Sequence, residues 1–291
     1  MKNPSTMNRR DFAKLSLLSV GGLAGCKETD SVVNAIDSHC HVWDKDGMAN
    51  KPPYPFETID QVAAPTGIQR FVVVVLYAES NESYVLKLRE LYPERIGIIS
   101  LLDPEDSELE AKMIANRKKG ILGYRLNSRF VGEDWLKSEN TDRMWKIAAD
   151  IDVSICLLRK PNASIASMKT MIAKHPSTKV VIDHLGLVDP SNAAEVESFL
   201  SLAEYEKCHV KVSRFFTNRA EQTGTEDMLA FVEKVYGAFG SERLMWGSNA
   251  PVEVSRPDDY QRGVNLIKDA PFLKPHDLHN IFVGTADKLF F

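Results

Sequence analysis

The sequence predicts an α/β fold, a single (β/α)8 TIM barrel, preceded by an export signal. Eight short apolar runs recur along the chain roughly 30 residues apart, which is the spacing of one β/α unit in a barrel of about 250 residues. Stretches with helical periodicity lie between these runs. The first run leads into His39-Cys40-His41, whereas the competing fold, an open doubly wound sheet, usually has a glycine-rich phosphate turn there. We therefore expect one barrel.

The apolar runs are the expected strands. The second run consists mainly of valine, a pattern typical of a parallel strand that is covered on both faces. In chain order, the runs cover residues 33–38, 71–77, 96–102, 121–126, 153–158, 179–183, 209–213 and 243–247.

The segments between the strands are expected to be helices. Asp103-Pro104 before Glu105 is a typical start signal, because proline suits the first turn of a helix. The helical candidates are residues 81–91, 104–119, 141–150, 165–175, 193–205 and 226–239.

The first 25 residues have the features of an export signal. Arg9-Arg10 is followed by an apolar stretch at 15–23, too short to cross a bilayer, and then by Gly25-Cys26. The segment resembles a twin-arginine signal joined to a lipoprotein box, in which Cys26 is lipidated. We expect a signal peptide at 1–25, a short linker at 26–34 and the barrel at 35–291. The protein would be exported by the twin-arginine route and lipid-anchored at the periplasmic or outer face of a bacterial membrane.

The charge balance argues against a nucleic-acid partner. The chain has 36 basic and 40 acidic residues and a net charge of −4, and the part after residue 25 carries −7. Phosphate backbones are repelled by such a surface. The lipid is the one membrane attachment we expect, because no segment after the expected signal approaches the roughly 18 uncharged apolar residues needed to cross a membrane. Besides Cys26, the chain has Cys40, Cys156 and Cys208, an odd number that does not indicate a disulfide framework.

Polar residues follow the expected strands at the end where barrel enzymes carry out their chemistry. The first strand supplies two histidines two residues apart, and such residues share one face of a strand. Two convergent imidazoles can hold a divalent cation or polarise a substrate oxygen. The candidate site residues are His39, His41, Tyr77, Glu79, Arg125, His184, Arg214 and Asn249.

Four motifs in this order resemble the amidohydrolase-related barrel hydrolases: Ile-Asp-Ser-His-Cys-His-Val-Trp from residue 36, Gly-Tyr-Arg-Leu-Asn from 123, Val-Ile-Asp-His-Leu-Gly from 181 and Arg-Leu-Met-Trp-Gly-Ser-Asn-Ala-Pro from 243. The resemblance is greatest to the branch that opens lactones of sugars and dicarboxylic acids. It implies a (β/α)8 fold and hydrolysis of an acyl C–O or C–N bond at the C-terminal mouth of the barrel.

The resemblance also implies roles for the candidate residues. His39, His41 and His184 match the catalytic histidines of the family, which are also its metal ligands. Arg125 and Arg214 match arginines that grip the substrate, with Tyr77 and Glu79 beside them. The eighth-strand carboxylate of the family falls on Asn249.

Asn249 leaves the reaction open, because an amide is not basic enough to take a proton from water. Glu79 or Asp183 can serve as the base instead, or Asn249 can orient a water that a metal or His184 activates. The third interpretation is a lipoprotein that binds its ligand without turning it over. A decarboxylase or other lyase of the same superfamily, acting on an aromatic or unsaturated acid, is a further alternative.

For the cofactor we expect either none or one weakly bound divalent metal, with zinc the best candidate. Three imidazoles suffice for zinc when water is the fourth ligand, but Arg159 and Lys160 at the end of the fifth strand would repel a cation. The expected partner is a small carboxylate, lactone or sugar acid, because arginines at strand ends suit carboxylates.

Overall fold

The computed structural model describes residues 34–45, 51–76, 78–127, 136–159, 164–215, 225–254, 256 and 258–291, with the backbone alone at 78–80, 225 and 226. The expected signal peptide, Cys26 and most of the linker lie outside this part of the chain. None of the helices that the structure describes has the length and apolar character needed to span a membrane.

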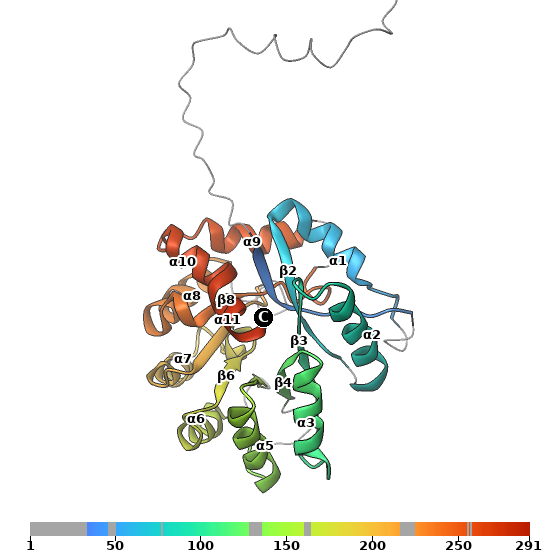
Figure 1. Ribbon diagram of the computed structural model, residues 1–291. Coiled ribbons are helices and arrows are strands. Elements are labelled where there is room, and N and C mark those ends of the chain that lie inside the picture. Colours follow the sequence, from blue (N-terminus) through green and yellow to red (C-terminus); the bar gives the residue numbers. More distant parts are fainter. Residues whose placement is uncertain are drawn as a thin grey trace, which may run out of the picture. The chain divides into compact units, whose positions relative to one another are not determined.

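Eight strands form one parallel sheet in the order of the chain, and helices surround it (Figure 1). All eight lie where the apolar runs predicted strands, so the predicted barrel is confirmed. The strands are β1 (Ala35–Cys40), β2 (Ile68–Val74), β3 (Ile96–Ser100), β4 (Ile121–Asn127), β5 (Ser154–Leu158), β6 (Lys179–Ile182), β7 (Cys208–Val212) and β8 (Leu244–Trp246).

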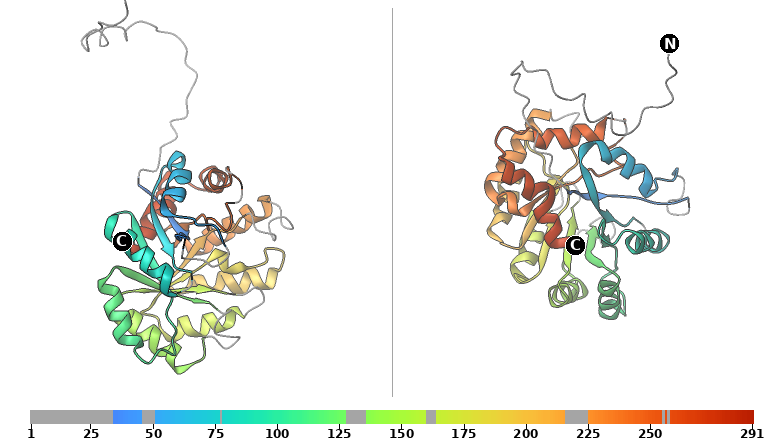
Figure 2. Two further views of the ribbon diagram at one scale, coloured as in Figure 1. Left: turned by 90° about the vertical axis from the view of Figure 1, so that its right-hand side faces the viewer. Right: turned by 45° about the horizontal axis from the view of Figure 1, so that its top comes forward.

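The helices between β1 and β8 alternate with the strands and lie around the sheet in each view (Figure 2), and the last helices follow β8 in succession. Six of them correspond to the helical candidates, which did not include the helices at Phe56–Ala63, Asp259–Lys268, Pro275–His279 and Thr285–Phe290. The helices are α1 (Phe56–Ala63), α2 (Ala78–Leu91), α3 (Leu109–Lys118), α5 (Glu139–Asp150), α6 (Ile165–Lys174), α7 (Ala193–Leu200), α8 (Thr225–Phe239), α9 (Asp259–Lys268), α10 (Pro275–His279) and α11 (Thr285–Phe290).

The barrel is nearly closed by the segment that follows β8. β8 itself is only three residues long. Beyond it, the backbone N–H of Asn249 donates to the carbonyl oxygen of His39 at 2.8 Å, and the N–H of His41 donates to the carbonyl oxygen of Ala250 at 2.8 Å. These two bonds place Asn249 next to the first-strand histidines, as the strand-end argument predicted.

The C-terminal helix α11 fills one end of the barrel. Leu289 and Phe290 pack with inward-facing residues such as Ile36 and Cys156 into an inner core, and the C-terminus lies at the centre of the strands in Figure 1. Gly97 of β3 permits this packing, because a Cβ there would lie 2.8 Å from the carbonyl oxygen of Phe290. With this end filled, the site is confined to the other end, where the strands finish.

Candidate active site

An irregularity in β1 aims the two histidines of the first strand. Asp37 pairs with Phe71 and Cys40 with Val73, so β1 holds one residue more than β2 over this interval. An extra residue of this kind reverses the alternation of side chains. Before the irregularity, Ile36 faces the inner core, and Asp37 faces outward and accepts from Tyr260 of α9 at 2.9 Å. The extra residue turns His39 back to the interior.

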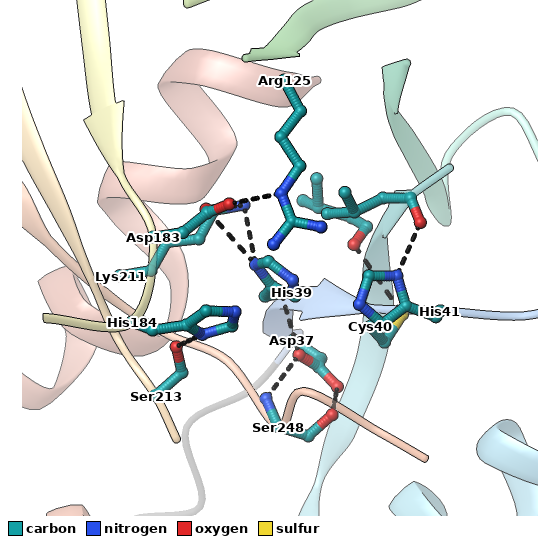
Figure 3. A network of polar contacts seen from close by, with 12 residues as sticks. Asp37, His39, Cys40, His41, Arg125, Asp183, His184, Lys211, Ser213 and Ser248 are labelled. Atoms are coloured by element: carbon teal, nitrogen blue, oxygen red, sulfur yellow. Dashed lines mark hydrogen bonds and ion pairs between the residues drawn. The ribbon is translucent and has the colours of Figure 1, made fainter. Parts of the chain in front are cut away.

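His39, His41 and His184 gather in one place, as the sequence predicted. The ring centroid of His39 lies 5.1 Å from that of His41 and 4.4 Å from that of His184, and His39 stands between the other two in Figure 3. Gly247, just after β8, makes room for this arrangement, because a Cβ there would lie 2.7 Å from the Cβ of His39.

Each of the three rings is held through Nδ1. Nδ1 of His41 donates to the carbonyl oxygen of Val74 at 2.7 Å, and Nδ1 of His184 lies 2.8 Å from the hydroxyl of Ser213. Nδ1 of His39 lies 3.3 Å from Nζ of Lys211. Among the described residues, Nε2 of His39 is buried without a hydrogen-bond partner.

His184 lies in a left-handed turn that the chain holds in place. Residues 184–187 have φ angles of 56°, 51°, 66° and 50°, a conformation that costs about 1–2 kcal/mol for each residue other than glycine. Buried Arg159 donates to the carbonyl oxygens of Gly186 at 2.6 Å and Leu187 at 3.1 Å. Arg159 thus stabilises the turn that holds His184. From the sequence we expected only that its charge would repel a metal.

A buried group of charges lies directly beside His39. Asp183 accepts from Nε of Arg125 at 2.8 Å through one carboxylate oxygen. Its other oxygen lies 3.3 Å from Nζ of Lys211 and 3.4 Å from Nδ1 of His39. Arg125 therefore lies in the site, as predicted, but its first partner is a protein carboxylate. Sequence reasoning missed Lys211, although a lysine in the middle of an apolar strand was a usable signal.

The environment keeps all three histidines neutral. Burial, together with the charge of Lys211, holds the pKa of His39 well below its usual value. Burial and the charge of Arg125 lower the pKa of His41 to about 3. Burial likewise lowers the pKa of His184 well below its usual value, although the charge of Asp183 acts in the opposite direction.

Asp183 is charged and poorly suited to be the base. Burial by itself would raise its pKa, but Lys211, His39 and Arg125 together hold it well below the usual value. A carboxylate of such low basicity takes a proton from water reluctantly. The pKa of His184 is lowered as well, so basicity by itself does not choose between Asp183 and His184 as the base.

The remaining candidate residues lie partly outside the structure. Tyr77 and the side chain of Glu79 are not among the described residues, so their roles stay predictions. Arg214 follows β7 with a φ of 70°, and its Nε lies 3.7 Å from a carboxylate oxygen of buried Glu253. Asn249 is buried and has a φ of 54°, a left-handed conformation that asparagine tolerates well.

Comparison with known proteins identifies the family. The model of the amidohydrolase family matches residues 36–291, which is nearly the whole of the described chain. The chain belongs to the amidohydrolase family. It is a hydrolase, as the motifs predicted.

Three relatives of this amidohydrolase illustrate the likeness. L-fucono-1,5-lactonase of Burkholderia ambifaria is 23% identical over 236 residues, covering 75% of this chain and 80% of its own. A probable 2-pyrone-4,6-dicarboxylic acid hydrolase from Acinetobacter baumannii, solved with citric acid bound, has a TM-score of 0.73 and 20% identity over 89% of this chain and 99% of its own. An amidohydrolase from Burkholderia multivorans, solved with bound zinc, has a TM-score of 0.74 and 19% identity over 88% and 99%.

The structure also permits a test of a metal in this site. Among the described residues, ligand atoms of His39, Asp183 and His184 lie within 4.8 Å of one another, a spacing consistent with one divalent cation. His41 is not in this group, although the sequence analysis counted it as a ligand. The distances suit a metal, but the local charges argue against one, because both oxygens of Asp183 already face Arg125 or Lys211. A dication there would meet two buried cations with one carboxylate to balance them, so the residues fit a metal poorly.

Proposed function

We propose that this amidohydrolase opens a lactone of a sugar or dicarboxylic acid. The observation that carries the proposal is the cluster of three neutral histidines beside Arg125 at the mouth of the barrel. The names of the lactonase relatives support the same substrate class. A polyhydroxylated or carboxylated lactone offers a carbonyl for the histidines and an anionic or hydroxyl group for the guanidinium.

In this proposal His184 takes the proton from the attacking water. The imidazolium that forms must be stabilised, and the carboxylate of Asp183 favours the charged form of His184. Both histidines experience both charges, but the largest charge effect on His184 comes from Asp183, whereas the largest on His41 comes from Arg125, which disfavours its charged form. The hydroxyl of Ser213, at 2.8 Å from Nδ1 of His184, can accept the second N–H of the imidazolium. Asn249 would orient the water.

A panel of lactones tests this function. Purified protein is mixed with 1,4- and 1,5-lactones of sugar acids and with a pyrone dicarboxylate, and acid release and CO2 are both measured. We expect acid without CO2. His184→Gln should lower kcat by about 10²- to 10⁴-fold. His209→Gln is the matched control, because this histidine of β7 bonds the carbonyl oxygen of Lys207 and lies outside the cluster.

The outcomes separate the alternatives. CO2 release from an aromatic or unsaturated acid would support a decarboxylase. Saturable binding of lactones or sugar acids without acid release would support a binding lipoprotein. Equal losses in His184→Gln and His209→Gln would contradict the role of His184.

We also propose the export route that the first residues predict. Support comes from Arg9-Arg10, the short apolar stretch and the small residues before Cys26. Cys26→Ser should convert a membrane-associated protein into an unprocessed or released one, and the double change Arg9→Lys and Arg10→Lys should stop export. Fractionation with the cytoplasm in all variants, and in the unaltered protein, would contradict the proposal.

A further inference from the structure

Lys211 is a completely buried lysine within the barrel. It lies on β7, with Nζ 3.3 Å from both Nδ1 of His39 and a carboxylate oxygen of Asp183. Its ammonium group also lies 5.7 Å from the ring centroid of Phe290, below the site. Placing an ammonium group out of water costs several kcal/mol before it is paired. Because burying this charge is unfavourable, we expect the charge of Lys211 to have a function in the groups that it contacts.

Two groups compete for Nδ1 of His39. Asp183, at 3.4 Å, would accept a proton carried by Nδ1, whereas an ammonium group can only donate and requires a lone pair there. If Nδ1 carried the proton, two N–H donors would face each other across 3.3 Å. If Nδ1 carries the lone pair, Lys211 bridges Nδ1 and the carboxylate, since it lies 3.3 Å from each. The second arrangement gives Nδ1 of His39 a hydrogen bond from Lys211, and it places the ammonium charge beside the Asp183 oxygen that lacks a hydrogen-bond partner among the described residues.

We propose that Lys211 is a positioning residue that fixes the proton of His39 on Nε2 and thereby makes His39 a hydrogen-bond donor to the substrate. Nε2 of His39 is the buried nitrogen that lacks a partner among the described residues. An N–H there can stabilise the oxyanion that forms when water attacks a carbonyl. The part of the inference that concerns the carbonyl rests on the proposed lactone hydrolysis, and the position of the proton does not.

The same proton prevents His39 from serving as a metal ligand. A ligating nitrogen must offer its lone pair, and metal-bound histidines usually donate their other N–H to a carboxylate or carbonyl. Without Lys211, Asp183 could accept from Nδ1 and leave Nε2 free to coordinate. Lys211 therefore supplies a resident positive charge beside the grouped ligand atoms of His39, Asp183 and His184.

The first experiment reads the proton directly. Protein labelled with ¹⁵N in its histidines is studied by long-range ¹H–¹⁵N correlation near neutral pH, and His39 is assigned by its absence in His39→Gln. We expect the signal of an N–H at Nε2 and of an unprotonated Nδ1. In Lys211→Met we expect the proton to move to Nδ1. A proton on Nδ1 of His39 in the unaltered protein would overturn the proposal.

The second experiment measures zinc binding by equilibrium dialysis followed by elemental analysis. Lys211→Met should bind one zinc at least about tenfold more tightly than the unaltered protein, and His184→Ala in the same background should remove the gain. The matched control is Lys179→Met, which removes an ion pair with Asp152 (2.8 Å) where β6 begins. It should leave zinc binding unchanged.

Equal zinc affinity in the unaltered protein and a folded Lys211→Met would contradict the proposal. If Lys211→Met does not fold, the proton position in the unaltered protein decides alone. Both measurements are made without substrate. Failure to hydrolyse any lactone would therefore reject the proposed function. The role of Lys211 would still be tested by the position of the His39 proton and by the zinc affinity.

Discussion

Arg159 donates from Nε to the carbonyl oxygen of Gly186 at 2.6 Å, and through this bond β5 supports the left-handed turn of His184. The guanidinium also bonds Glu195 of α7. A buried arginine in this position ties the strand, the turn and the helix together. It stabilises a backbone conformation that the residues of the turn would otherwise avoid.

Arg159→Met should therefore destabilise the protein and displace His184. Loss of the bonds to Gly186 and Leu187 leaves buried acceptors without partners, for which we expect about 2–4 kcal/mol in urea unfolding. The kcat of the proposed lactone hydrolysis should fall as well. Arg143→Met is the control, because Arg143 forms an exposed ion pair with Glu110 (3.4 Å) and should cost less than about 1 kcal/mol. Equal effects of the two changes would contradict the bracing role.

Gly247→Ala should reduce activity more than it alters the fold. The new Cβ would lie 2.7 Å from the Cβ of His39, so the histidine must shift. A displacement of about 1 Å in a catalytic group can cost roughly 10²-fold in rate. Gly237→Ala in α8, where a Cβ meets nothing within 4 Å, should instead be neutral or stabilising by about 0.5–1 kcal/mol. Full activity of Gly247→Ala would show that His39 tolerates displacement.

Asp37→Asn should change how stability depends on pH. Burial raises the pKa of Asp37 to about 6, against the lowering influence of hydrogen bonds from Ser248, His39 and Tyr260. The folded state therefore binds this proton more tightly than the unfolded state. The resulting stabilisation is complete below about pH 4 and is lost as the pH rises through about 6.

Asparagine does not titrate, so the free energies of unfolding of Asp37→Asn and of the unaltered protein should depend differently on pH. The free energy of unfolding of Asp37→Asn, relative to the unaltered protein, should rise by roughly 2 kcal/mol between pH 4 and 7. Urea unfolding followed by tryptophan fluorescence at a series of pH values measures this. A constant difference over that range would place the pKa of Asp37 near its usual value.

Asn249→Asp should raise the rate of lactone hydrolysis. Aspartate tolerates the left-handed φ of 54° at this position as asparagine does, so the backbone is preserved. The resemblance to the family implies that a carboxylate at this strand end would supply a general base, which is worth about 10²- to 10⁴-fold in rate. Asn265→Asp, on the exposed face of α9, is the control. An unchanged kcat in Asn249→Asp would show that proton transfer from water does not limit the rate.

The sequence by itself determined the alternation of strands and helices and the place of most site residues. Both follow from short-range periodicity: apolar runs mark strands, and the residue after a strand of a parallel barrel lies at its mouth. For this reason the sequence predicted that His39, His41, Arg125, His184 and Asn249 lie together at one end of the barrel, and the structure brings them together. Their roles in a reaction stay predictions. The C-terminal helix α11 was not predicted, because Leu289 and Phe290 pack into the end of the barrel, a contact that the local sequence does not indicate.

The tertiary structure alone decided the direction and the charge environment of these residues. The extra residue in β1 depends on its pairing with β2, and it sends Asp37 outward while His39 returns to the interior. Lys211 meets His39 across 172 residues of chain, a contact that no local pattern encodes. The same lysine in an apolar strand would be an ordinary solvated residue at the surface. Beside a buried carboxylate and imidazole it is a paired charge, because the energy of a buried charge depends on its partners in space.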